Sequence, residues 1–388
     1  MLQNNHQKAF IYLALSTAGF YSLLGVIFST GKIIAFFEVL CLLPLILWAI
    51  IDRGKTLTPL LKTPIAISLA AYIAYFLVSS TWSSNPVHHG YWNMVRFSLY
   101  SFIFFAIVAT MLHLSNKSQK IKIATFVLTI GSITGLYALL NFYPIQGNQL
   151  TERFYMTGRI SHAIHGLYYF ALVAILAFAI WIKSQNKKAL VALSISAICF
   201  YMTESRGPFI ALAGALAGIA LLTSKKIPIK SIFIFATTTS TFFAIGLYNW
   251  GINRGSSKRL IIWESALEKI NDAPIFGHGN DLLNIVYRDE YEQVHAHNIW
   301  ISHLYWGGVT AAILLLICYL FLIRTFWLSR DSTLGMTGLG LTVFSLLALA
   351  TYGNILVSSP GDLWFVFIIP CGMACSIELN KKMGNPNE

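Results

Sequence analysis

Charged residues are scarce in this sequence. Only 11% of its 388 residues are Asp, Glu, Lys or Arg, and 56% are hydrophobic, whereas soluble domains usually carry about 25% charged residues. The length alone would suit about two or three soluble domains. The composition excludes a soluble protein and indicates one that is largely embedded in a lipid bilayer.

Several catalytic and structural motifs are also missing. The complete phosphate-binding loop Gly-x-x-x-x-Gly-Lys-Ser/Thr does not occur, and no serine stands in a nucleophile elbow. ATP hydrolysis and Ser-His-acid catalysis are therefore not indicated. The cysteines all fall inside apolar stretches, without the spacing of a zinc knuckle or a loop disulfide. They are Cys41, Cys199, Cys318, Cys371 and Cys375.

Long apolar stretches dominate the chain. About twelve of them approach the ~17–25 residues that a helix needs to cross a bilayer. The pattern predicts an all-α, polytopic integral membrane protein, folded as a single membrane domain over residues 1–388. The stretches are 9–29, 33–51, 64–82, 97–114, 123–143, 162–182, 189–203, 208–223, 231–250, 299–323, 333–350 and 363–377.

The net charge of +12 is explained by topology. If the N-terminus is cytoplasmic, the lysine-rich connections, such as 117–122 and 183–188, all fall on one side of the membrane. The positive-inside rule makes this side the cytoplasm. We therefore expect both termini in the cytoplasm, membrane lipid as the surroundings, and no nucleic-acid partner.

Arginine outnumbers lysine on the opposite, outer side. The planar fork of arginine grips phosphate or carboxylate better than a lysine ammonium does. The bias indicates an outward-facing anion site, although arginines that snorkel at helix ends produce the same pattern. The outer arginines are Arg96, Arg153, Arg159, Arg206, Arg254, Arg259 and Arg288.

The longest outer segment covers residues 251–298. Leu260, Trp263, Leu267 and Ile270 recur in it at helical spacing, and charged residues cover much of the remaining surface. The pattern predicts an amphipathic surface helix near 258–272 in a periplasmic loop. A proline and two glycines follow this stretch and end it.

Arg206 lies in the outer stretch TESRGPF, residues 203–209. Pro208 suits the first turn of a helix, and a helix N-terminus favours anions. Arg206 is therefore a candidate anion ligand. An ion pair with the neighbouring Glu204 is the alternative interpretation.

His295 and His297 directly precede another inward-running helix. Asn298 is a good N-cap for that helix, and the helix dipole disfavours a charged imidazolium beside it. A neutral histidine is suited to act as a general base. A zinc site made by the His-x-His pair and simple hydrogen bonding to loop carbonyls remain as alternatives.

A second histidine pair, His162 and His165, stands at the start of another inward-running helix, just after Arg159. The three residues are candidates to line a substrate, and interfacial packing against neighbouring tyrosines explains them equally well. His303 fits a packed core histidine. Glu38, inside an apolar stretch, is a candidate functional acid whose partner the sequence does not name.

Three stretches together resemble the O-antigen ligase and O-antigen polymerase superfamily: TESRGPF, KRLIIWESALEKINDAPIFGHG and HAHNIWISHLYWGG. The second stretch is similar to the family's Arg-x-x-x-Trp helix ending in Pro-x-x-Gly-x-Gly, and the third to its His-Asn before a glycine. The family often has a second glycine three residues after this one, where this chain has Thr310. The matching positions are Arg259, Trp263, Pro274, Gly277, Gly279, His297, Asn298 and Gly307.

The resemblance implies a glycosyltransferase of the bacterial inner membrane with a periplasmic active site. Its donor would be an undecaprenyl-diphosphate-linked glycan and its acceptor a sugar hydroxyl, in an inverting reaction without metal or other cofactor. By the same resemblance, His297 is the base, while Arg206 and Arg259 hold the diphosphate. His295 is a second candidate to bind phosphate, and Trp263 and Asn298 are candidates to line the substrate.

Within the superfamily we favour a ligase of lipopolysaccharide biosynthesis, whose acceptor is the lipid A–core oligosaccharide. Polymerases often carry two large arginine-rich outer loops, whereas here only 251–298 is long and 144–161 is short. An O-antigen or capsule polymerase is the runner-up. A protein O-oligosaccharyltransferase is disfavoured because no large domain follows the last apolar stretch. A non-enzymatic lipid-glycan transporter is a further alternative; it would show paired halves or broken helices, and the sequence has no convincing internal symmetry.

Overall fold

The computed structural model describes residues 43–52, 55–84, 90–156, 162–222, 259–283, 285–287, 291–293, 295–353 and 355–383. The regular structure in these residues is helical apart from one short antiparallel hairpin, which pairs Ile285–Tyr287 (β1) with Tyr291–Gln293 (β2). The helices before the hairpin are α3 (Leu43–Asp52), α4 (Leu57–Leu61), α5 (Pro64–Ser79), α6 (Tyr91–Leu114), α7 (Lys117–Leu140), α8 (His165–Ser184), α9 (Lys187–Met202), α10 (Arg206–Leu222) and α12 (Arg259–Ile270). Those after it are α13 (Ile299–Trp327), α14 (Thr333–Leu349), α15 (Leu363–Val366) and α16 (Ile368–Lys382).

Among the described residues, 6 helical segments are long and apolar enough to cross a membrane. Two shorter apolar helices, α10 and α14, accompany them. The predicted stretches 9–29 and 231–250 lie outside the described residues, and 33–51 is described only from residue 43. The expectation of about twelve spans therefore stays a prediction. The six segments are Pro64–Trp82, Tyr91–Leu114, Lys117–Ile145, His165–Ser184, Ile299–Trp327 and Leu363–Lys382.

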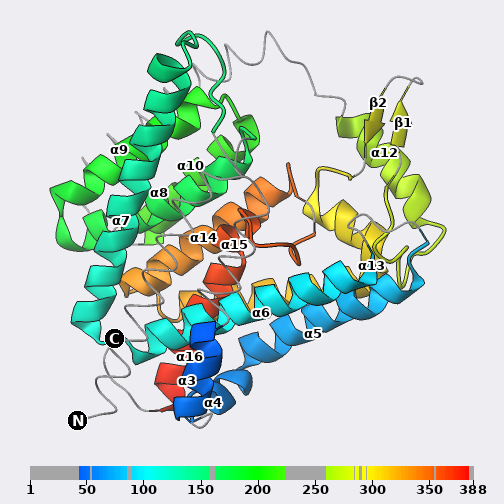
Figure 1. The fold of residues 1–388 in the computed structure, drawn as a ribbon, viewed down its shortest axis with the longest axis horizontal. Coiled ribbons are helices and arrows are strands. Elements are labelled where there is room, and N and C mark those ends of the chain that lie inside the picture. The colour runs from blue at the N-terminus through cyan, green and yellow to red at the C-terminus, as the bar shows by residue number, and fades with distance from the viewer. Residues whose placement is uncertain are drawn as a thin grey trace.

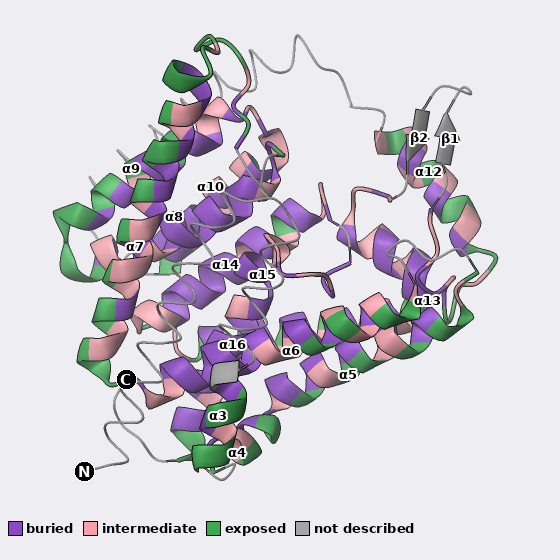
Figure 2. Ribbon diagram, viewed as in Figure 1, coloured by how far each residue is buried: buried purple, intermediate pink, exposed green. Residues whose placement is uncertain are grey.

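The helices form two groups joined by α14 (Figure 1). In one group α6 packs against α16, and α5 packs against α13; in the other, α8 and α7 pack against α9. Helix α14 contacts α10 and α8 on one side and α13 and α16 on the other. Burial follows this arrangement, because α8, α14 and α16 are buried along most of their length, while α5 and α7 expose one side (Figure 2).

The connections predicted to be cytoplasmic lie together at one end of the bundle. Lys183, in the last turn of α8, donates a hydrogen bond to the carbonyl of Asp331 in the connection between α13 and α14. Lys382, at the end of α16, donates to the carbonyl of Lys62 before α5, with 3.1 Å between nitrogen and oxygen. The lysine-rich connections thus share one end, as the alternation of the apolar stretches requires.

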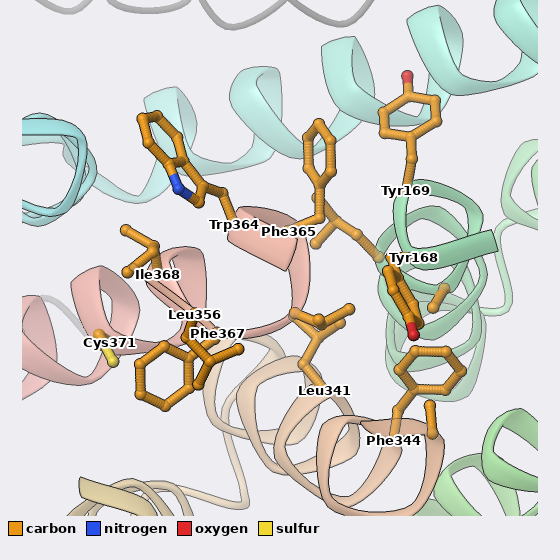
Figure 3. Close-up of a cluster of buried hydrophobic side chains, with 14 of the residues drawn as sticks. Tyr168, Tyr169, Leu341, Phe344, Leu356, Trp364, Phe365, Phe367, Ile368 and Cys371 are labelled. Atoms are coloured by element: carbon orange, nitrogen blue, oxygen red, sulfur yellow. The ribbon is translucent and has the colours of Figure 1, made fainter. Parts of the chain in front are cut away.

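The short helix α15 and the start of α16 form a wedge in the core (Figure 3). The ring of Trp364 stacks on Phe104 of α6 with centroids 4.8 Å apart, and Phe365 meets Tyr169 of α8 edge-on at 5.1 Å. Such aromatic pairs add about 0.5–1.5 kcal/mol each beyond the area that they bury. The wedge therefore fixes the chain between α14 and α15 against both helix groups.

Helix α13 is broken at Gly308, whose backbone is not helical (φ 60°, ψ −164°). The loop that follows α12 fills the break. The amide of Val309 donates to the carbonyl of Pro274 at 2.9 Å, and the hydroxyl of Thr310 donates to the carbonyl of Ile275 at 2.9 Å. A Cβ added at Gly308 would lie 2.3 Å from the Ile275 carbonyl carbon, so only glycine fits there.

Gly277, the first glycine of the Pro-x-x-Gly-x-Gly motif, packs against this break from the other side. Gly277 adopts a positive φ of 70°, and a Cβ there would lie 2.5 Å from the backbone nitrogens of Gly307 and Gly308. We call residues 273–279 together with 307–310 the α13 clasp. Thr310 stands where the family often has glycine, and its hydroxyl adds a hydrogen bond to the clasp instead of disrupting it.

Candidate functional site

Five segments meet at the end of the bundle opposite to Lys183 and Lys382. They are the turn before α8, the start of α10, the start of α12, the loop before α13 and the connection between α14 and α15. We call the polar residues that they contribute the site cluster. Its members are His162, His165, Arg206, Arg259, His295, His297, Tyr352 and Asp362.

His297 stands at the entrance to α13 in a left-handed backbone conformation (φ 50°). Asn298 caps the helix as predicted, because its side-chain oxygen accepts the amides of Trp300 at 2.9 Å and Ile301 at 3.3 Å. The amide of His297 donates to Nδ1 of His295 at 3.3 Å. A non-glycine residue at positive φ is uncommon, and here the cap and the neighbouring ring together hold it.

The pKa of His297 is lowered to about 3, first by burial and then by the nearby His295, Arg259 and His162. The imidazole is therefore neutral at physiological pH, as predicted. The predicted cause was the helix dipole, whereas the main cause is desolvation of the charged form. A neutral, half-buried imidazole retains a lone pair that can accept a proton.

Arg259 and Arg206 begin two different helices and face the same region. Arg259 is half-buried, and its pKa is lowered by burial and by the like charge of Arg206, while Arg259 in turn lowers the pKa of His297. Two guanidinium groups that repel one another at partly buried positions are stabilised by an anion between them. The structure thus brings the predicted anion ligands and the predicted base into one cluster.

Trp263 connects α12 to the loop that contains His295 and His297. Its indole Nε1 donates to the carbonyl of Ala296 at 2.9 Å. The predicted apolar face of α12 is divided in the structure: Ile270 is buried against the protein, while Leu260 and Leu267 are 66% and 48% exposed. Ile262, rather than Leu260, begins the protein-facing side. The helix therefore has one apolar side for the protein and a second facing outward.

Tyr352 is a member of the site cluster that the sequence analysis did not single out. Its hydroxyl lies 3.3 Å from Nε2 of His165, and Asp362 Oδ1 lies 3.8 Å from Nδ1 of the same ring. The signal that could have found both residues is the short polar segment 351–362, which separates two apolar stretches on the predicted outer side.

Arg153 supports Arg206 from outside the site cluster. Its Nε donates to the carbonyl of Thr203 at 2.7 Å, and one terminal nitrogen donates to the hydroxyl of Ser205 at 3.0 Å. Both acceptors belong to the turn between α9 and α10. The guanidinium of Arg153 therefore fixes the turn from which α10 and Arg206 begin.

Three further candidates from the sequence are Arg159, Glu38 and His303. Arg159 and Glu38 lie outside the described residues. His303 is fully buried inside α13: its Nδ1 donates to the carbonyl of Ile299 at 2.7 Å, and its Nε2 lies 2.7 Å from the hydroxyl of Tyr72. This confirms the packed role expected for His303.

In the part of the chain that the structure describes, no group of three or more His, Cys, Asp and Glu side chains is arranged to hold a metal ion. His162 and His165 do lie close together, with ring centroids 4.9 Å apart, and so do His295 and His297 at 4.0 Å. The ring of Tyr352 lies beside both pairs, so each pair belongs to the larger site cluster.

Comparison with known proteins agrees with the family resemblance of the three motifs. The model of the O-Antigen ligase family matches residues 189–316, a range that contains Arg206, Arg259 and His297. A curated O-antigen ligase of Pseudomonas aeruginosa is 26% identical over 352 residues, which cover 89% of this chain and 85% of the relative. The resemblance predicted from the three motifs is therefore confirmed, by the family model over residues 189–316 and by the relative over most of the chain.

Proposed function

We propose that the protein is an O-antigen ligase, a glycosyltransferase that moves a glycan from undecaprenyl diphosphate to a sugar hydroxyl of the lipid A–core oligosaccharide. One observation carries the proposal: Arg206, Arg259 and His297, which the family motifs contain, converge from three separate segments at one end of the bundle. The similarity to a curated O-antigen ligase over most of both chains supports the same assignment.

Arg206 and Arg259 bind the diphosphate of the donor in this proposal. Each stands at the start of a helix, α10 and α12, where backbone amides and the helix dipole also favour an anion. Negative charge grows on the diphosphate as its bond to the sugar breaks. Preorganised positive groups at that point stabilise the transition state more than the ground state.

His297 is the general base. Its neutral imidazole takes the proton of the acceptor hydroxyl while the hydroxyl oxygen attacks the anomeric carbon. The bond from that carbon to the diphosphate breaks, and undecaprenyl diphosphate leaves. Attack from the face opposite to the leaving group inverts the anomeric centre, so the reaction needs no covalent enzyme intermediate. His295 lies beside His297 and orients it or contacts phosphate.

The site faces the periplasm in this proposal. The site cluster lies at the end of the bundle opposite to the contacts of Lys183 and Lys382, and the positive-inside rule gives the lysine-rich end to the cytoplasm. A periplasmic site meets both the donor and the finished lipid A–core.

The test is a reaction with purified protein, carrier-linked glycan and one of two acceptors. With lipid A–core present, we expect a product in which the glycan is joined to the core. With carrier-linked glycan as the sole acceptor, we expect no chain extension. Extension of the carrier-linked glycan, without transfer to the core, would instead identify a polymerase.

The same assay separates the proposed roles. His297→Ala should abolish transfer, and His113→Ala is the matched control, because His113 lies at the opposite end of the bundle, against Asn380. Activity is compared per folded molecule, because His113→Ala leaves the buried Asn380 without this partner and lowers stability. Wild-type activity in a folded His297→Ala preparation would rule out this residue as the base.

A further inference from the structure

Tyr352 is the common neighbour of all four histidines in the site cluster. Its ring centroid lies 5.4 Å from that of His162, 5.6 Å from His165, 6.0 Å from His295 and 5.1 Å from His297. These histidines come from two segments that are far apart in the sequence. A single ring from a third segment therefore joins the two histidine pairs.

The backbone of Tyr352 is fixed from several directions. Its amide donates to the carbonyl of Ala348 at 3.0 Å, and its carbonyl accepts the hydroxyl of Tyr168 at 2.6 Å. The next residue, Gly353, packs so closely that a Cβ there would lie 2.8 Å from the amide nitrogen of Ile299 in the first turn of α13. Movement of Tyr352 relative to the start of α13 is therefore sterically restricted.

The hydroxyl of Tyr352 is held as well. Asp362 lies 3.8 Å from Nδ1 of His165, which favours the tautomer with its proton on Nδ1. Nε2 of His165 is then free to accept the hydroxyl of Tyr352 at 3.3 Å. Burial raises the pKa of Tyr352 to about 12, so the hydroxyl keeps its proton and cannot serve as a base near neutral pH.

We propose that Tyr352 is a positioning residue for His297: its ring sets the orientation of the imidazole, and the contact of its hydroxyl with His165, which Asp362 orients, fixes the ring. This inference rests on the proposed role of His297 as the base. The ring positions His297 because it contacts the imidazole directly, whereas the hydroxyl contacts only His165 and thereby holds the ring in place. An imidazole displaced by about 1 Å can cost about 100-fold in rate.

The experiment compares Tyr352→Phe and Tyr352→Leu by steady-state kinetics with varied donor. Tyr352→Phe keeps the ring and loses one hydrogen bond, so kcat should fall by about threefold to tenfold. Tyr352→Leu removes the ring, so kcat should fall by about 100-fold. The KM for the donor should stay within about twofold in both, because Arg206 and Arg259 bind the diphosphate.

Tyr137→Leu is the matched control, because this tyrosine is exposed on α7, away from the site cluster, and kcat should be unchanged. Each variant is checked for thermal stability, and Tyr352→Met replaces Tyr352→Leu if the latter is unstable, with the same expectation. Equal losses in the Phe and Leu variants, or a rise in donor KM without a fall in kcat, would overturn the positioning role.

His297→Ala is measured in parallel to separate this inference from the proposed function. If His297→Ala is inactive and Tyr352→Leu keeps full kcat, the positioning role fails while the base assignment stands. If His297→Ala is fully active, the proposed base is wrong and Tyr352 has no base to position. A selective loss of kcat in Tyr352→Leu with partial rescue by Phe supports the inference.

Discussion

Two tyrosine–histidine contacts lie close to one another in this protein and have opposite characters. His303 is fully buried, and its two ring nitrogens contact the Ile299 carbonyl and the Tyr72 hydroxyl. His165 contacts the Tyr352 hydroxyl, but its side chain is 34% exposed and lies beside His162 and Asp362. A hydrogen bond between tyrosine and histidine therefore does not by itself indicate chemistry. Access to solvent and neighbouring charge distinguish the two.

The largest expected effect is that of removing the proposed base, His297, from the site cluster. His297→Ala should lower kcat for glycan transfer by about 10²–10⁴-fold, the usual contribution of a positioned general base. The thermal midpoint should not change, because the ring is half-buried at the entrance to α13. A loss of activity that tracks a loss of folded protein would show that His297, like His303, has only a structural role.

His303→Leu should have the opposite profile. The substitution leaves the Tyr72 hydroxyl buried without its acceptor, which costs about 1–3 kcal/mol of stability. Thermal unfolding in detergent or lipid should report the loss, while kcat per folded molecule stays at the wild-type value. A folded His303→Leu protein with greatly reduced kcat would show that the two tyrosine–histidine contacts are functionally linked.

Arg259→Lys tests the anion site beside the histidines. Lysine keeps the charge but lacks the bidentate fork, so the KM for the carrier-linked donor should rise by about tenfold, the value of one charge-assisted hydrogen bond. Arg330→Lys, at the opposite end of the bundle over the ring of Trp327, is the control. An unchanged donor KM in Arg259→Lys would remove Arg259 from the diphosphate site.

The smallest expected effect is that of pH. The neutral imidazole is the active form of a base, and the pKa of His297 is lowered to about 3, so the active form persists as the pH falls through the usual range of histidine. The ratio kcat/KM should therefore stay flat from about pH 8 to about pH 5 on the acid side. An acid limb near about pH 6.5, the ordinary histidine pKa, would mean that His297 is solvated.

Local signals in the sequence predicted the parts of the site that depend on helix ends. Asn298 caps α13, and Arg206, a predicted anion ligand at a helix start, begins α10. The role of Arg259 came from the family resemblance, and the helix predicted near 258–272 begins at this residue. Caps and helix starts are determined by a few neighbouring residues, so they can be read without knowledge of the fold. The apolar stretches likewise predicted the described helices, because length and composition alone make a helix long enough for a bilayer.

Tyr352 and Asp362 could not be predicted in the same way. Their side chains reach the histidines only because the chain between α14 and α15 is held by the aromatic wedge around Trp364 and by the hydroxyl of Tyr168. The lowered pKa of His297 has a similar origin, since burial is a property of the packed state. The side of α12 that faces the protein also depends on packing, as Leu260 shows by its exposure.

The α13 clasp holds two parts of the site together. The loop after α12 is bonded into the gap in α13 through Pro274 and Ile275, and Trp263 bonds to the residue before His297. Arg259 and His297 are therefore held at a fixed spacing. The start of α10 is packed against the same region, because a Cβ at Gly207 would clash with the side chain of Thr351, the neighbour of Tyr352. On the proposed function, a lipid-borne sugar chain would have to enter the site without changing the spacing of Arg259 and His297.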